Sequence, residues 1–337
     1  MSNSISRHSR RTTPWDAVEN KSPTQQFLFD LYQKHYIERH PPLNTTGEEI
    51  LINSFKPDSC PYCNEVHMRK NGLTNNGVQR YLCLSCGKKF TPVTGTIFEN
   101  HKISITEWME YTLNILRYVS INAGSWNNKN AFTTSRYWLE KLFILLEEST
   151  ADIMLTKRVW LDETYYSVRS DDIKLNENGL KPRGLSRNQI CIGVACDENQ
   201  IFCTCEGFGQ PTRESTYKAF EKHIAHGSVL VHDKSKVHGR LIDELGLISE
   251  EYDSSEIKLL PDSENPMNRV NEVHARLKDF LNAHSSFNRD NLLGYLNLFT
   301  FAMNPPTNNL QKVELLLEKG FKTRKTLKYR QFYNVNE

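Results

Sequence analysis

The sequence lacks long hydrophobic runs, an apolar leader and any strong excess of charge. No stretch of about 18 consecutive apolar residues occurs in the 337-residue chain, so no membrane-spanning helix and no membrane partner are expected. The first residues are polar and basic and lack the apolar segment of a secretory signal peptide. We therefore expect a cytoplasmic protein. The formal net charge of +2 neither requires nor excludes a nucleic-acid partner.

The length and the ordinary composition, with 38% hydrophobic and 24% charged residues, favour two or more domains. We expect an α/β fold class: a ribonuclease-H-like catalytic domain preceded by a zinc ribbon and a helical, helix-turn-helix-like region. The expected segments are a leader with one helix near 24–38 (1–55), a zinc ribbon (56–92), a helical region (93–152), a catalytic domain (153–305) and a basic C-terminal tail (306–337).

Cysteine pairs form the most specific motif in the chain. Two Cys-x-x-Cys pairs are separated by 19 residues, and they consist of Cys60, Cys63, Cys83 and Cys86. This pattern is typical of a closed, structural four-thiolate zinc site. Two disulfides are the alternative, which the lack of a signal peptide disfavours. The other cysteines alternate with apolar residues, so we expect buried free thiols at Cys191, Cys196, Cys203 and Cys205.

The predicted zinc ribbon also carries basic and aromatic side chains. A segment this small buries too little apolar surface to fold alone, so zinc binding would supply the folding free energy. Arg80, Lys88 and Lys89 lie beside the cysteine pairs and are candidates for contact with DNA phosphates. A basic zinc ribbon can also bind protein, and this alternative stays open.

Helical signals follow the ribbon. Ser104-Ile-Thr-Glu107 has the pattern of a capping box, a break is expected at 122–125, and a second helix is expected from about 133 to 148. Helices joined by a short turn favour a helix-turn-helix, whose second helix presents its first residues to the major groove. Thr134, Ser135 and Arg136 would then face DNA. An ordinary helical hairpin is the alternative.

Two apolar strands each carry an aspartate. The run at 159–168 has Asp162 in its middle, and the run at 228–233 ends on Asp233. A carboxylate in an apolar strand is costly unless it is paired or binds a cation. Two such strands predict a magnesium site for phosphoryl transfer. Asp162 could instead be a structural acid, and Glu163 should point to the opposite face of its strand.

The order of elements in 153–305 supports this prediction. Three leading strands are followed by alternating helices and strands, which is the order of a ribonuclease-H-like domain. A short strand is expected at 257–260 and a long helix from Asn268. On that helix Asn271 and Lys278 lie two turns apart, roughly 10 Å along the axis, and border the apolar stripe.

Asn271 could present a carbonyl oxygen to a metal, and Lys278 a cation to a DNA phosphate. Glu264 and Glu272 are other candidates for the third metal ligand. Glu272 forms a charge ladder with Arg276 and Asp279, which is more simply a solvent-facing surface. Whether Asn271 or Glu272 completes the site stays open at the level of the sequence.

The combination of these motifs resembles the ISXO-type insertion-sequence transposases, whose catalytic signature is DDNK or DDEK. The resemblance covers roughly residues 57–303, and Asn268, Asn271 and Lys278 match the spacing of the family. It implies that Asp162, Asp233 and Asn271 hold Mg²⁺ or Mn²⁺ and that Lys278 contacts a phosphate near the cut. The chain departs from the DDEK version by having Asn271, which is a neutral and weaker ligand.

The resemblance further implies a DNA transposase. Such a protein cleaves the terminal inverted repeats of its element and joins the freed 3′ hydroxyl to target DNA. It acts on double-stranded DNA, and a homo-oligomer is expected. A DNA-binding regulator, or a domesticated transposase without cleavage activity, is the main alternative. A structure-specific nuclease of the same fold is a third possibility.

Overall fold

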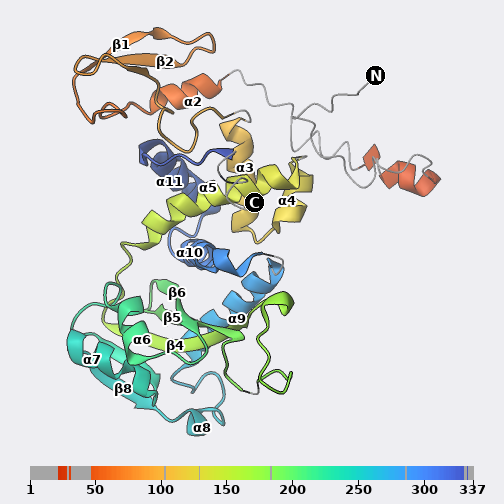
Figure 1. Ribbon diagram of the computed structural model, residues 1–337, viewed down its shortest axis with the longest axis vertical. Coiled ribbons are helices and arrows are strands. Elements are labelled where there is room, and N and C mark those ends of the chain that lie inside the picture. Colours follow the sequence, from red (N-terminus) through yellow and green to blue (C-terminus); the bar gives the residue numbers. More distant parts are fainter. Residues whose placement is uncertain are drawn as a thin grey trace. The chain divides into compact units, whose positions relative to one another are not determined.

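The computed structural model describes residues 22–28, 30–31, 47–101, 104–128, 130–182, 184–284, 287–329 and 332 (Figure 1). The chain divides into two compact units. Unit 1 contains the residues up to Leu145 together with those from Asn309 onward, and unit 2 contains Leu146–Asn308. Of the expected leader helix, residues 23–28 and 30–31 are helical, and the remainder lies outside the described residues.

A small cysteine-rich module forms part of unit 1. Its elements are α2 (Glu48–Ser54), β1 (Met68–Leu73), β2 (Gln79–Cys83) and β3 (Lys89–Phe90). The strands form an antiparallel sheet in the order β1-β2-β3. The core of the module is small and contains Cys60, Tyr81, Cys83 and Phe90, with the two rings stacked at 5.8 Å. Such a core is too small to hold the fold by apolar burial alone.

Unit 1 also contains the helices α3 (Ile105–Leu116), α4 (Ile121–Asn127) and α11 (Asn309–Lys322), and α5 (Phe132–Thr150) as far as Leu145. The predicted cap is confirmed, since the Ser104 side chain accepts a hydrogen bond from the Glu107 N–H at 3.2 Å. The break expected at 122–125 is instead helical. The chain turns earlier, at Tyr118 with a left-handed φ of 61°, and Ser120 then caps α4.

The segment predicted to be a basic tail contains a packed helix. α11 buries Val313, Leu316, Leu317 and Phe321, which recur at helical spacing. Phe321 stacks on Phe55 at 4.0 Å, and the Tyr137 hydroxyl donates to the Leu327 carbonyl. The tail was predicted from basic residues such as Arg324, Lys325 and Lys328, which follow α11. The apolar stripe of α11 belongs to the core of unit 1.

Unit 2 is a mixed α/β domain, as predicted. Its strands are β4 (Arg158–Ser167), β5 (Gln189–Cys196), β6 (Ile201–Phe208), β7 (Val229–Asp233) and β8 (Ile248–Tyr252). They form one five-stranded sheet in the order β6-β5-β4-β7-β8. The pairs β4–β5 and β5–β6 are antiparallel, while β4–β7 and β7–β8 are parallel. β4, the first strand of the unit, is therefore central.

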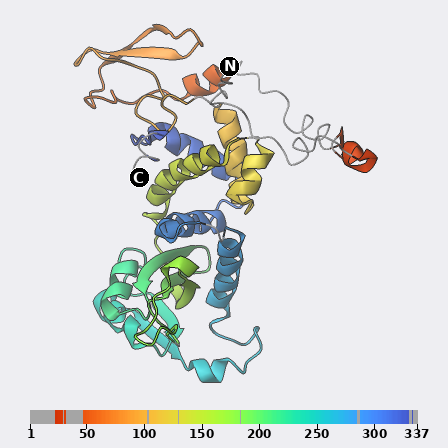
Figure 2. The same ribbon diagram turned by 45° about the vertical axis from the view of Figure 1, so that its right-hand side comes forward.

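Helices cover both faces of this sheet (Figures 1 and 2). They are α6 (Arg213–Phe220), α7 (Gly239–Leu245), α9 (Asn268–Ala283) and α10 (Leu292–Met303), while the short α8 (Ser254–Ile257) follows β8 and buries none of its residues. The prediction of a strand at 257–260 was wrong. The last strand of the sheet is β8, and the chain then forms α8. Among the described residues, no helix combines the length and the apolar character needed to cross a membrane.

β4 divides its side chains between the two faces. Val159 and Leu161 join a buried cluster with Leu230 of β7 and Leu241 of α7. The alternate side chains face α9: the Trp160 indole donates to the Pro266 carbonyl at 2.9 Å, before the helix begins. The Tyr166 hydroxyl donates to the Leu281 carbonyl at 3.3 Å, near its end. α9 therefore runs along β4 on the face that carries Asp162.

Candidate active site

The two predicted aspartates lie on neighbouring parallel strands. Trp160 of β4 pairs with Val231 of β7, so Asp162 and Asp233 stand at the same level two residues further on. Side chains alternate along a strand, which places both carboxylates on the face opposite Leu161 and Leu230. The Asp162 side chain is 26% exposed and that of Asp233 is 35% exposed, so both carboxylates reach solvent.

The electrostatics of Asp162 indicate a site that lacks positive charge. Burial, together with the charges of Glu163 and Asp233, raises the pKa of Asp162 to about 7. The charge of Asp233 disfavours the ionised form of Asp162, and a divalent cation bound there would favour it. Oxygen ligands from carboxylates are those that Mg²⁺ and Mn²⁺ prefer. The residues present therefore fit such a cation.

α9 brings a histidine to Asp162. His274 lies in the buried stripe of the helix, and its Nδ1 is 3.8 Å from Oδ2 of Asp162. Burial and the nearby charge of Lys278 together lower the pKa of His274 to about 4, although a hydrogen bond with the Asp162 backbone acts in the opposite direction. Asn271 is one turn before His274 and Lys278 is one turn after it, and both are exposed. The predicted Asn271–Lys278 line thus flanks a residue that the sequence interpretation missed.

Glu272 lies in a different direction. Two residues along a helix turn the side chain by roughly 200°, so Glu272 points away from the side on which His274 meets Asp162. Glu272 is exposed and accepts a hydrogen bond of 3.4 Å from the Asn268 amide. This geometry favours Asn271 over Glu272 as the helical neighbour of the aspartates.

A buried polar network supports the site from the opposite face. Glu163 Oε1 is 2.9 Å from His238 Nε2, and His238 Nδ1 is 3.1 Å from His232 Nδ1. Nδ1 of His238 is also 4.0 Å from Asp233 Oδ1. Burial lowers the pKa of His238, but the hydrogen bond and charge of Glu163 outweigh it, so the net shift is upward. The sequence interpretation did not include His232 and His238. The signal that the sequence offered for them was their position near Asp233, one residue before it and five residues after it.

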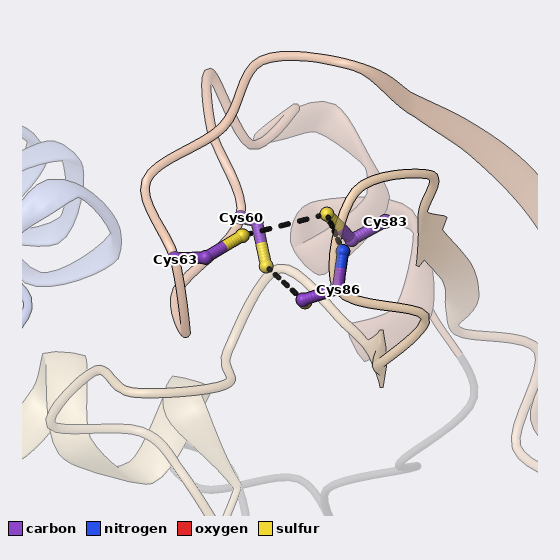
Figure 3. A group of neighbouring side chains, drawn as sticks. All are labelled: Cys60, Cys63, Cys83 and Cys86. Atoms are coloured by element: carbon purple, nitrogen blue, oxygen red, sulfur yellow. Dashed lines mark hydrogen bonds between the residues drawn. The ribbon is translucent and has the colours of Figure 1, made fainter.

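The four paired cysteines converge in unit 1 (Figure 3). Their sulfur atoms lie within 4.8 Å of one another, with 3.7 Å between Cys60 and Cys86 and 3.6 Å between Cys63 and Cys83. Metal–sulfur bonds of about 2.3 Å in a tetrahedron separate the sulfurs by about 3.8 Å, so the cluster fits a single zinc ion. None of the four forms a disulfide.

Backbone N–H groups donate hydrogen bonds to sulfur atoms of this cluster. The Cys86 N–H donates to Cys83 Sγ at 3.5 Å and helps to lower the pKa of Cys83 to about 6. The Tyr62 N–H donates to Cys60 Sγ at 3.5 Å. Of the remaining cysteines, the predicted buried free thiols are found at Cys191, Cys196 and Cys203. Cys205, near the end of β6, is exposed, so the prediction of a buried thiol was wrong there.

The candidate DNA contacts differ in exposure. Arg80, Lys88 and Lys89 are exposed on the cysteine-rich module. Thr134 and Arg136 are half-buried at the start of α5, and the Arg136 guanidinium lies 5.5 Å from the Phe332 ring. The interpretation of Ser135 was wrong: this residue is 0% exposed, and the Tyr111 hydroxyl donates to its carbonyl at 2.7 Å. In this structure Ser135 packs the helices together and does not face DNA.

Comparison with known proteins gives only distant similarity. No family model matches the chain, and no curated protein matches it significantly. Among solved structures, a chain of the simian T-cell lymphotropic virus intasome complex with the PP2A regulatory subunit B56 gamma aligns at 15% identity and a TM-score of 0.27, over 57% of this chain and 65% of that chain. The Mos1 strand transfer complex aligns at 11% identity and a TM-score of 0.23, over 65% and 63% of the two chains.

A pre-cleavage Mos1 transpososome aligns at 9% identity and a TM-score of 0.21, over 65% of this chain and 64% of that chain. The alignments therefore span less than two thirds of the length of these solved chains. TM-scores below 0.5 are too low to assign this chain a fold or an activity.

Proposed function

We propose that this chain is a metal-dependent DNA transposase whose unit 2 is a ribonuclease-H-like catalytic domain. The observation that carries the proposal is the placement of Asp162 and Asp233 side by side on one sheet face, beside α9. The element order of unit 2 supports the fold, since three antiparallel strands are followed by two parallel strands alternating with helices. The resemblance of the motifs to the ISXO-type transposases supports the substrate.

The chain supplies the ligands and the charges for this chemistry. Asp162, Asp233 and Asn271 would hold Mg²⁺ or Mn²⁺, and Lys278 would contact a phosphate next to the cut. When bound, the metal activates the attacking hydroxyl and stabilises the charge on the leaving oxygen. The Glu163–His238–His232 network would keep the Asp233 end of β7 in place. Neutral Asn271 binds a cation more weakly than glutamate does, so the two aspartates carry most of the binding.

DNA binding is assigned to unit 1. Zinc held by the four paired cysteines would stabilise the cysteine-rich module, whose exposed basic residues Arg80, Lys88 and Lys89 contact phosphates. Thr134 and Arg136 at the start of α5 would add contacts. The partners are the terminal inverted repeats of the element and the target DNA, and the chain would act as a homo-oligomer on them.

Strand cleavage tests the proposal. The full chain is incubated with Mg²⁺ or Mn²⁺ and with duplex DNA taken from the sequence flanking its gene. We expect nicks at a defined position. Asp162→Asn and Asp233→Asn should lower the cleavage rate about 10³-fold or more while leaving DNA binding intact, because each removes a ligand of the reacting centre.

Asp171→Asn is the matched control, because Asp171 is an exposed acid in a short 3-10 helix (Ser170–Asp172) of the same unit. Its cleavage rate should equal that of the wild type. DNA that is bound but never cut with either metal would favour the regulator alternative over the transposase.

A further inference from the structure

His274 lies on the buried side of α9, next to Asp162. Its side chain comes from the middle of α9, a rigid helix tied to β4 through Pro266 before it begins and through Leu281 near its end. The imidazole is 8% exposed. Its Nε2 is buried and has no hydrogen-bond partner among the described residues. This atom is not the nitrogen that faces Asp162, which is Nδ1.

The distance between His274 and Asp162 suits a shared metal better than a hydrogen bond. At 3.8 Å, Nδ1 of His274 and Oδ2 of Asp162 are too far apart for a hydrogen bond. Two ligands with metal bonds of about 2.1 Å are separated by about 3.0 Å when adjacent and about 4.2 Å when opposite. The observed separation lies within that range. One ion could therefore contact both atoms without moving the backbone.

Resting on the proposed function, we propose that His274 is a nitrogen ligand of the divalent cation bound by Asp162. The cation site would then combine the carboxylates of Asp162 and Asp233 with an imidazole from α9, while Asn271 and Lys278 flank it on the exposed surface. An imidazole is a softer ligand than a carboxylate. We therefore expect the site to prefer Mn²⁺ to Mg²⁺.

A packing role is the competing explanation for the same residue. His274 shares its stripe with Val270, Val273 and Leu277, so it could fill the interface between α9 and the sheet. In that case its nitrogens would never contact the ion. The two explanations differ in whether a nitrogen nucleus couples to the bound metal.

Pulsed electron paramagnetic resonance on the full chain with Mn²⁺ distinguishes them. We expect modulation from a directly bound ¹⁴N nucleus in the wild type, and its loss in His274→Ala and His274→Asn. His274→Asn keeps an oxygen ligand and a similar volume, so a folded variant without ¹⁴N coupling would assign the nitrogen to His274. Mn²⁺ affinity should fall about tenfold or more in His274→Ala.

His284→Ala is the matched control. His284 follows α9, is buried, and has two ring nitrogens without partners, yet it has no ion pair with an acid among the described residues. Its removal should leave the ¹⁴N coupling unchanged. Coupling that persists in His274→Ala would assign the nitrogen to another imidazole, with His232 and His238 as the first candidates, and would overturn the inference.

Two outcomes separate this inference from the proposed function. If Mn²⁺ binds the wild type without ¹⁴N coupling, and Asp162→Asn abolishes binding, His274 is a packing residue and the proposed function stands. If the wild type binds no Mn²⁺ at all, the proposed function fails and the inference fails with it.

Discussion

Glu206 lies on β6, and few groups stabilise the negative charge of its buried carboxyl group. Its Oε1 atom is buried without a partner among the described residues, while the Thr216 hydroxyl donates to Oε2 at 2.5 Å. Room for this side chain depends on Gly193, where an added Cβ would lie 2.2 Å from Oε1 and 2.7 Å from the Phe220 ring. Burial raises the pKa of Glu206 to about 7.

Removing the Glu206 charge should stabilise unit 2 at alkaline pH. Between its ordinary pKa of 4.5 and about 7, folded Glu206 binds more protons than the unfolded residue, so stability falls as pH rises through this window. Glu206→Gln removes that loss and keeps an acceptor for Thr216. We expect its unfolding free energy to exceed that of the wild type by about 1–3 kcal/mol at pH 8 and to match it near pH 4.

Urea unfolding followed through hydrogen exchange of the β5 amides measures this difference. Glu177→Gln, in an exposed loop of the same unit, is the control and should show no pH-dependent gain. An equal effect of Glu206→Gln at pH 4 and pH 8 would contradict the assigned protonation.

Single residues differ in how well the sequence reveals them. Asp162 stands out because an acid interrupts a strand of aromatic and β-branched residues. His274 does not, because its helical spacing with Val270 and Leu277 is that of an ordinary core residue. Ser135 is polar and sits in the first turn of α5, yet it is buried by contacts that come from α3. The surroundings of these residues depend on contacts with segments that are distant in the sequence, and local patterns do not reveal such contacts.

Among the elements, we expect the cysteine-rich module to depend most on a bound ion. Its core is limited to four residues, and its strands are short. Cys63→Ser removes one of four thiolates, so we expect zinc content to fall from about one ion per chain to well below it. Hydrogen exchange should then rise across residues 60–90 while the strands of unit 2 keep their protection.

Cys205→Ser is the matched control, because Cys205 lies on β6 outside the cluster. It should retain the zinc content of the wild type. Full zinc content in Cys63→Ser would remove the four-thiolate assignment and leave the proximity of the cysteines unexplained.

The existence of the elements was easier to predict than their pairing. Apolar runs, and cysteines that alternate with apolar residues, indicated β4, β5, β6 and β7 in advance, because such patterns are local properties of the sequence. The parallel pairing of β4 with β7 joins segments about 70 residues apart, and no local pattern encodes it. The metal-site hypothesis assumed this neighbourhood, and the structure shows it. α11 was missed although its stripe was visible, because the basic residues after it dominated the interpretation.

The chain first forms part of unit 1, then all of unit 2, and finally the remainder of unit 1. Residues from Asn309 onward complete unit 1, with Phe321 packed between Phe55 and Phe98 at centroid distances of 4.0 and 5.0 Å. Unit 2 is thus inserted between two parts of unit 1. The segment assigned to DNA binding and the segment assigned to catalysis are therefore joined by two chain connections.

Strand joining tests the central claim most directly. The full chain, with zinc and Mn²⁺ present, is mixed with a duplex whose end carries a free 3′ hydroxyl and with a supercoiled plasmid. In the proposed reaction the 3′ oxygen bonds to a target phosphorus and displaces the 3′ oxygen of the cut strand, which takes up a proton. The bond count is unchanged, so no external energy source is needed.

We predict a covalent product of labelled end and plasmid in the wild type, its absence in Asp162→Asn and Asp233→Asn, and normal amounts in Asp171→Asn. A wild-type protein that binds the DNA end and Mn²⁺ but yields no joined product would contradict the assignment of unit 2 as a transposase domain.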